Sequence, residues 1–222
     1  MKIKPYKLIF LGVLLVAPFA SCSCSSGGGS SSPTLVPTTP DVSDSSVSTT
    51  PAVVVPKPTA LANISDLNKV VIYSLNNTYL VRSNSSIKDG STEVYRVERT
   101  INVEDTQTKS GSVLTYYYEL DEDFKLTRRT DVKQFKNLDI DTLLGINLNE
   151  SYLKDISIST SSVTYKVNAA NAKDYYKNDD VTSDTDVAVS MTISDFKITN
   201  ITTSYSLNGK TISSETTYSY LA

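Results

Sequence analysis

The feature that most constrains the fold is a two-residue turn, Asn208-Gly209, between two alternating segments near the C-terminus. Asn-Gly favours a type I′ turn, in which both central residues have positive φ and the backbone twist matches that of the flanking strands. This turn places Tyr205 opposite Ile212 and separates an apolar face from a uniformly polar one. The expected apolar face holds Ile201, Tyr205, Leu207, Ile212, Tyr218 and Tyr220. We therefore predict an antiparallel sheet with one dry and one solvated face.

Three further segments are typical of strands. Residues 92–103 alternate in polarity, and residues 112–120 are rich in Tyr and β-branched side chains. The acidic residues 121–123 then provide a turn before residues 124–135 run extended again. Together these segments predict a meander within a single domain over residues 59–222.

Short helical signals interrupt the strands. Residues 138–144 end at Gly145, a plausible left-handed cap, and residues 168–177 place small and aromatic side chains along one stripe. Residues 64–75 fit two structures: a helix capped by Ser65, or a buried strand over residues 70–73. We predict a mainly β fold, in which an antiparallel meander forms a curved sheet, a sandwich or a half-barrel with one to three short helices.

The N-terminus has the composition of a signal peptide over residues 1–21. Lys2, Lys4 and Lys7 flank an apolar run at residues 8–20. This run is too short to cross a bilayer about 30 Å thick as a helix, but it suits the core of a signal peptide. We expect the segment to be removed from the mature protein.

The sequence Phe19-Ala20-Ser21-Cys22 resembles the lipobox of bacterial lipoproteins. The resemblance implies that the Cys22 thiol carries the lipid, with Cys24 as a second candidate. Cleavage after Ser23 by ordinary signal peptidase would instead release a secreted protein. Because Ser23, and not Asp, follows Cys22, the resemblance favours an outer-membrane or cell-surface location.

Residues 22–58 are rich in Ser, Gly, Pro and Thr and lack periodicity, which predicts a lipid-anchored linker. The two cysteines lie at the cleavage site, so we expect no disulfide framework in the domain. Removing residues 1–21 takes three lysines from 21 basic residues, leaving 18 against 24 acidic ones. This balance argues against a nucleic-acid partner.

The chain contains no histidine, which excludes Ser-His-Asp catalysis and histidine-ligated metals. A pair of catalytic carboxylates stays open as a minor alternative. Two acidic clusters, at residues 121–123 and 179–186, resemble calcium ligands, but they lack the Gly of a compact binding loop and favour solvated turns. We predict no catalytic residues, no cofactor and no metal site.

Thirteen tyrosines follow the signal peptide, among them Tyr116, Tyr117 and Tyr118. A tyrosine stripe could stack on sugar or hold an apolar ligand, but tyrosine also fits the half-buried surface of a sheet core, which we favour. We expect a non-enzymatic envelope lipoprotein that presents its β domain to a protein or glycan partner. The alternative is a carrier of a lipid or hydrophobic ligand in a curved-sheet cavity, which is an analogy at the level of the fold.

Overall fold

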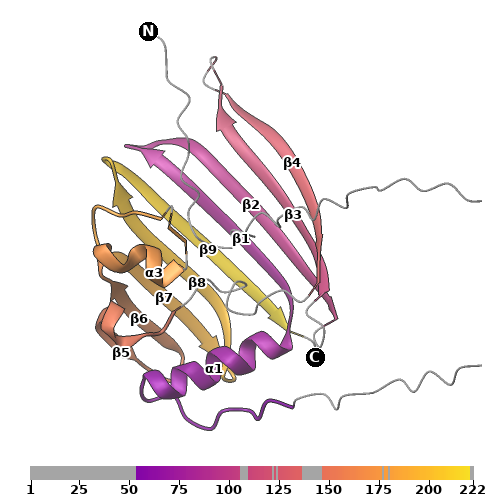
Figure 1. Ribbon diagram of the computed structural model, residues 1–222, viewed down its shortest axis with the longest axis vertical. Helices are drawn as coiled ribbons and strands as arrows, with labels where there is room; N and C mark the ends of the chain where they lie inside the picture. Colours follow the sequence, from indigo (N-terminus) through magenta and orange to yellow (C-terminus); the bar gives the residue numbers. More distant parts are fainter. Residues whose placement is uncertain are drawn as a thin grey trace, which may run out of the picture. The chain divides into compact units, whose positions relative to one another are not determined.

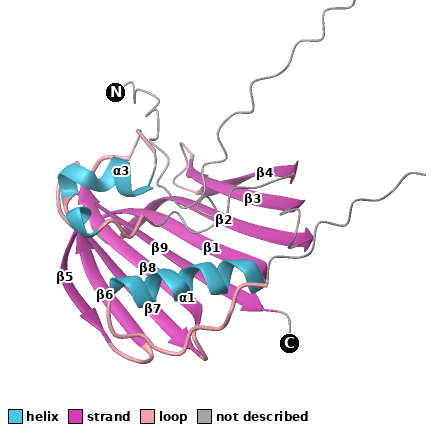
Figure 2. Cartoon of the chain, turned by 60° about the horizontal axis from the view of Figure 1, so that its bottom comes forward, coloured by secondary structure: helices cyan, strands magenta, loops and turns pink. Residues whose placement is uncertain are grey.

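The computed structural model describes residues 54–105, 110–121, 123, 125–136, 147–176, 178–179 and 181–220. Nine strands of these residues form one open, curved antiparallel sheet, with helices against one face (Figures 1 and 2). The strands are β1 Thr78–Asp89, β2 Thr92–Asp105, β3 Ser110–Leu120, β4 Leu126–Phe135, β5 Leu153–Ile158, β6 Ser162–Val167, β7 Val187–Ser194, β8 Lys197–Leu207 and β9 Lys210–Tyr220. The helices are α1 Ile64–Asn77 and α3 Ala172–Tyr176, with short 3-10 turns at Glu150–Tyr152 and Ala169–Asn171. The mainly β fold is confirmed, and of the three expected forms it is the single curved sheet.

The strand order is β4-β3-β2-β1-β9-β8-β7-β6-β5. Two meanders, β1 to β4 and β5 to β9, therefore meet at the centre of the sheet, where the first strand pairs with the last. The β1 and β9 register runs from Thr78 opposite Tyr220 to Lys88 opposite Thr211. The chain also passes from one outer edge, β4, to the other, β5. The sheet is complete only when residues more than 120 positions apart have paired.

The C-terminal hairpin forms as predicted. Asn208 and Gly209 have φ values of 51° and 74°, and Tyr205 lies opposite Ile212. The apolar face of the hairpin is buried or half-buried along its length. The same face also contains Thr203 and Ser214, whose hydroxyl oxygens lie 2.7 Å apart in the core. The expectation of one dry and one solvated face is confirmed.

The predicted meander corresponds to β2, β3 and β4, with small differences at the strand ends. Arg99 is an exception to the alternation of β2, because it shares the apolar face with Ile101. Its Nε donates a hydrogen bond to Thr115 Oγ1 at 3.4 Å, and burial lowers the pKa of its guanidinium group.

The ambiguous segment at residues 64–75 is the helix α1, and the alternative strand at residues 70–73 is wrong. The cap also differs from the prediction: Asn63, not Ser65, accepts a hydrogen bond from the backbone N–H of Asp66 at 2.9 Å. The helical prediction at residues 168–177 is confirmed by the 3-10 turn and α3. The prediction at residues 138–144 lies outside the described residues.

The core lies between the apolar sheet face and the two helices (Figure 2). Leu67 and Val70 of α1 have no exposed surface, and Tyr175 of α3 is 1% exposed. These side chains belong to the same buried cluster as apolar residues of β6, β7, β8 and β9. Burial of each such side chain stabilises the fold by roughly 1.5–3 kcal/mol. This burial holds the helices against the apolar face, and polar residues occupy the other face.

Candidate functional site

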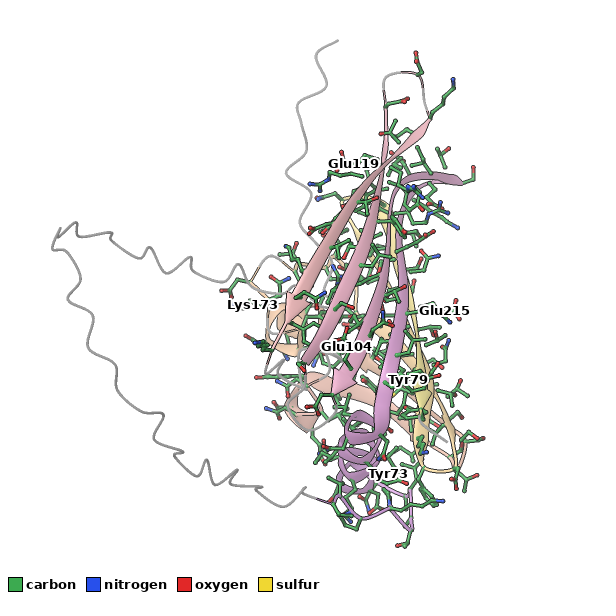
Figure 3. All side chains as sticks on the ribbon, turned by 90° about the vertical axis from the view of Figure 1, so that its right-hand side faces the viewer. Tyr73, Tyr79, Glu104, Glu119, Lys173 and Glu215 are labelled. Carbon is green, nitrogen blue, oxygen red and sulfur yellow. The ribbon has the colours of Figure 1, made fainter. Side chains whose placement is uncertain are left out.

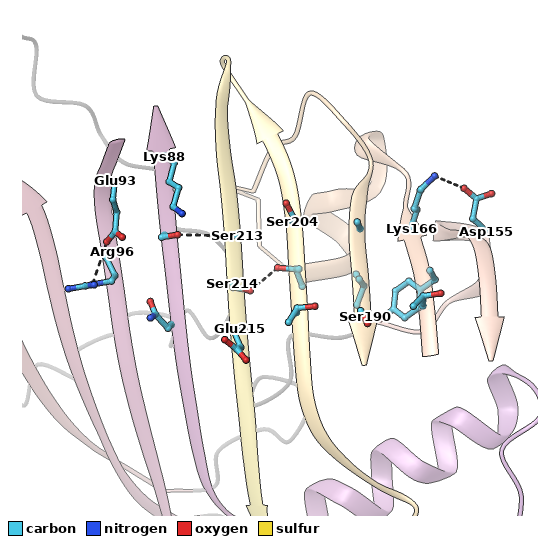
Figure 4. Close-up of a pocket in the computed structure, with 18 residues that line it drawn as sticks. Lys88, Glu93, Arg96, Asp155, Lys166, Ser190, Ser204, Ser213, Ser214 and Glu215 are labelled. Atoms are coloured by element: carbon cyan, nitrogen blue, oxygen red, sulfur yellow. Dashed lines mark hydrogen bonds and ion pairs between the residues drawn. The ribbon is translucent and has the colours of Figure 1, made fainter. Parts of the chain in front are cut away.

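A groove of about 730 Å³ crosses the polar face of the sheet (Figure 4). Its lining comes from seven neighbouring strands, from β2 at one end to β5 at the other. Figure 3 shows the two sides of the sheet, with Glu215 on the polar side and Lys173 of α3 on the opposite side. We call this feature the polar groove and take it as the candidate functional site.

The floor of the polar groove carries hydroxyl and amide side chains. Ser86 and Ser213 lie on adjacent strands with their hydroxyl oxygens 3.1 Å apart. Other polar side chains on its floor are exposed, namely Asn84, Thr164, Ser190, Thr202 and Ser204. These groups reach one surface because alternate residues of each strand point to the same face. The floor therefore offers both hydrogen-bond donors and acceptors.

Charged pairs stand at the two ends of the polar groove. At the β2 end, Arg96 Nε lies 3.4 Å from Glu93 and 3.3 Å from Glu98. At the β5 end, Lys166 Nζ lies 2.8 Å from Asp155. The hydrogen bond from Lys166 lowers the pKa of the Asp155 carboxyl group, so this carboxylate is ionised at neutral pH.

Between the two ends, Glu215 accepts a hydrogen bond from Asn200 Nδ2 at 2.8 Å. Each of the three carboxylates that line the polar groove thus has a polar partner within the protein.

Most of the tyrosines either are buried or lie in a consecutive run on β3. Six of those in the described residues are buried and at most 8% exposed: Tyr95, Tyr165, Tyr175, Tyr176, Tyr205 and Tyr218. Tyr165 and Tyr175 join hydroxyl to hydroxyl at 2.5 Å, and their rings meet edge to face. Burial raises the pKa of both groups. These residues build the core, as we favoured.

The consecutive tyrosines of β3 each lie under an arginine. The guanidinium carbon of Arg96 is 4.4 Å from the Tyr118 ring centroid, and that of Arg129 is 4.5 Å from the Tyr117 centroid. Arg128 lies 4.8 Å from the Tyr116 centroid. Such cation–π contacts stabilise the strand pairing and occupy one face of each ring. The alternative interpretation, a tyrosine stripe that stacks on sugar, therefore finds no open platform in these three rings.

The acidic clusters hold the backbone in place. Asp121 Oδ1 accepts hydrogen bonds from the backbone N–H groups of Asp123 and Lys125, at 3.0 and 2.8 Å. In the second cluster, Asp184 accepts from the backbone N–H of the Asn208 turn, and Asp186 pairs with Lys154. Within the described residues, no group of three or more acidic or cysteine side chains is placed to hold a metal ion.

Both edges of the sheet carry features that oppose the addition of a further strand. At the β5 edge, the register shifts between Lys154 and Ser157, and Asp155 has a φ of 54°. At the β4 edge, Arg129, Asp131 and Lys133 occupy the apolar-face positions. Bulges and inward-pointing charges are common protections of exposed edges. These features favour recognition through a face of the sheet over recognition through its edges.

The polar groove was not predicted from the sequence, because its residues are ordinary outward positions of strands that are distant in sequence. The available signal was the uniformly polar face of the C-terminal hairpin, which forms part of the floor. Cys22, the predicted lipidation site, lies outside the described residues. No helix in the part of the chain that the structure describes is both long and apolar enough to span a membrane. Comparison with known proteins finds no matching family model and no curated protein with significant similarity.

Proposed function

We propose that this chain is a membrane-anchored bacterial envelope lipoprotein of non-enzymatic type, whose β domain binds a partner through the polar groove. The observation that carries the proposal is the groove itself, about 730 Å³ in volume and lined by seven strands. Concave sites with several convergent polar groups are typical of ligand binding. The anchor is proposed from the lipobox-like sequence ending at Cys22, with an outer-membrane or cell-surface location.

The packed apolar face supports binding through the polar groove over the carrier alternative. A carrier needs a hollow apolar face, whereas Leu67, Val70 and Tyr175 fill this face against β6 to β9. A ligand on that side would have to displace buried side chains, each of which contributes roughly 1.5–3 kcal/mol.

The ionised state of Asp155 supports a non-enzymatic role. A general acid acting on a glycan needs a carboxyl group whose pKa is raised by its surroundings. Asp155 has the opposite shift, because Lys166 stabilises its ionised form. The Asp155–Lys166 pair therefore suits binding better than proton transfer.

The anchor is tested by comparing Cys22→Ala with Cys24→Ala in the full-length chain. We expect Cys22→Ala to move the protein from the membrane to the soluble fraction and to abolish incorporation of a labelled fatty acid. Cys24→Ala should leave both unchanged. Membrane retention and labelling of the Cys22→Ala protein would contradict the proposed anchor.

The binding role is tested with a pair of matched substitutions on the polar face. Thr202→Arg fills the polar groove, whereas Thr130→Arg makes the same change on the same face of β4, outside the groove. We expect purified envelope fragments to retain the wild-type and Thr130→Arg proteins but not the Thr202→Arg protein. Equal retention of all three proteins, or of none, would refute the binding role.

A further inference from the structure

The polar groove is unsuited to an apolar ligand. Across its floor, the outward positions of β1, β9, β8, β7 and β6 carry hydroxyl, amide and charged groups, with Ala188 as the apolar exception. Tyr165 and Val189 also line the groove, but they are only 2% and 3% exposed because their side chains belong to the core face. A lipid tail would leave these polar groups desolvated without partners, which is costly.

The charges of the polar groove balance one another. Its cations are Lys88, Arg96 and Lys166, and its anions are Glu93, Asp155 and Glu215. Two of the cations already form ion pairs with groove carboxylates. Nucleic acids and other polyanions need clustered, unneutralised cations, and polycations need the reverse. The balance therefore matches a ligand without net charge.

Hydroxyl groups dominate what remains on the floor. Each serine or threonine hydroxyl both donates and accepts hydrogen bonds, and Asn84 adds an amide. Sugar rings present the same mixed donor and acceptor pattern from their own hydroxyls. A carboxylate such as that of Glu215 can additionally accept from a sugar hydroxyl. We infer that the polar groove binds an uncharged oligosaccharide. This inference rests on the proposed function and specifies the class of its ligand.

Recognition in this site relies on hydrogen bonds more than on aromatic stacking. Tyr116 and Tyr118 point to the same face but lie outside the groove lining, each under an arginine. Because each hydrogen bond to the ligand replaces hydrogen bonds to water and contributes little net free energy, one sugar ring gains little affinity. The groove spans seven strands, and neighbouring strands lie about 4.8 Å apart. A chain of several sugar rings can therefore form many hydrogen bonds along it.

The test uses the full-length chain, purified in detergent, with neutral oligosaccharides of glucose and of N-acetylglucosamine, from the monosaccharide to the hexasaccharide. Binding is measured by titration calorimetry. We expect affinity to rise with chain length, so that the hexasaccharide binds about tenfold or more tightly than the disaccharide. Raising the salt concentration should change the affinity by less than about twofold, because the site has no net charge to screen.

The substituted proteins locate the site. Thr202→Arg should weaken hexasaccharide binding by about tenfold or more, and Thr130→Arg should leave it unchanged. Failure of every oligosaccharide to bind, or binding that survives Thr202→Arg, would overturn the inference. If oligosaccharides fail while an envelope protein is retained in a manner that depends on Thr202, the glycan assignment is wrong but the binding role stands.

Discussion

Ser74 Oγ of α1 accepts a hydrogen bond from the backbone N–H of Ile198 at the start of β8, at a distance of 2.9 Å. The same hydroxyl donates to the carbonyl oxygen of Val70 at 2.6 Å. Ser74 is 1% exposed and Ile198 is fully buried. A single side chain therefore joins the helix to the sheet and satisfies a buried strand N–H.

We expect Ser74→Ala to lower the free energy of unfolding by about 1–3 kcal/mol, because the Ile198 N–H is left buried without an acceptor. Ser65→Ala is the matched control: Ser65 is exposed in the first turn of the same helix, and alanine favours the helix. Urea denaturation compares the two variants. An equally small effect of both substitutions would contradict the role of the Ser74 hydrogen bond.

Gly111 is required where β3 passes between β2 and β4. A Cβ atom there would overlap the backbone carbonyl oxygen of Asn102 and lie 2.9 Å from Phe135 Cζ. We expect Gly111→Ala to destabilise the fold by about 1–3 kcal/mol, since overpacking forces the neighbouring strands apart. Ser112→Ala, one position along on the polar face, should change stability by less than about 0.5 kcal/mol. Thermal unfolding measures both, and a neutral Gly111→Ala would show that the strands separate easily.

The buried Thr203 and Ser214 hydroxyls, 2.7 Å apart, should behave as a coupled pair. Thr203→Val or Ser214→Ala alone leaves the other hydroxyl with one partner fewer in the core, at a cost of about 1–3 kcal/mol. The double substitution removes both groups, so we expect it to cost less than the sum of the single ones by about 0.5–3 kcal/mol. A double-mutant cycle in urea measures the coupling. Strict additivity would mean that the two hydroxyls do not depend on each other.

The core tyrosines predict loss of stability in alkali. Burial raises the pKa of Tyr165, Tyr175 and Tyr218 and raises that of Tyr176 to about 12. In the unfolded chain tyrosine ionises near pH 10, so above that pH the unfolded state binds fewer protons and stability falls. The stabilisation is fully present below about pH 10 and is lost as the pH rises through the folded-state values.

The measurement is the free energy of unfolding as a function of pH, with phenolate absorbance as a second signal. Tyr176→Phe should reduce the slope by up to about 1.4 kcal/mol per pH unit between pH 10 and 12, because one such group no longer titrates. Tyr79→Phe is the control, since Tyr79 is 37% exposed. Equal slopes for the two variants would contradict the assignment of the effect to buried tyrosine.

Local chemistry explains which elements were predicted. The Asn208-Gly209 turn and the alternation on either side are sufficient to set a hairpin register, and the structure has that register. The turn between β7 and β8 is also a two-residue turn with positive φ, at Asp195 and Phe196, but an aromatic residue rarely adopts that conformation. Sequence patterns could not indicate it, because the surrounding strands impose the conformation.

The strand β1 was missed for a related reason. Its polar sequence, with serines at residues 83, 85 and 86, lacks the apolar alternation of a typical strand. It becomes an interior strand because β2 and β9 supply hydrogen-bond partners on both sides. For the same reason the polar groove was not predicted, since its residues become neighbours only after β1 and β9 have paired.

The amino-acid order alone was enough for the C-terminal hairpin, the β2 to β4 meander and the division of strands into a dry and a solvated side. Turn preferences and alternation act between residues that are close along the chain, so they are present before any long-range contact forms. Tertiary structure decided the pairing of the first and last strands, the use of Asn63 as the α1 cap and the gathering of polar groups from seven strands into one groove. These features depend on contacts between distant segments, whose formation is driven by burial of the shared core.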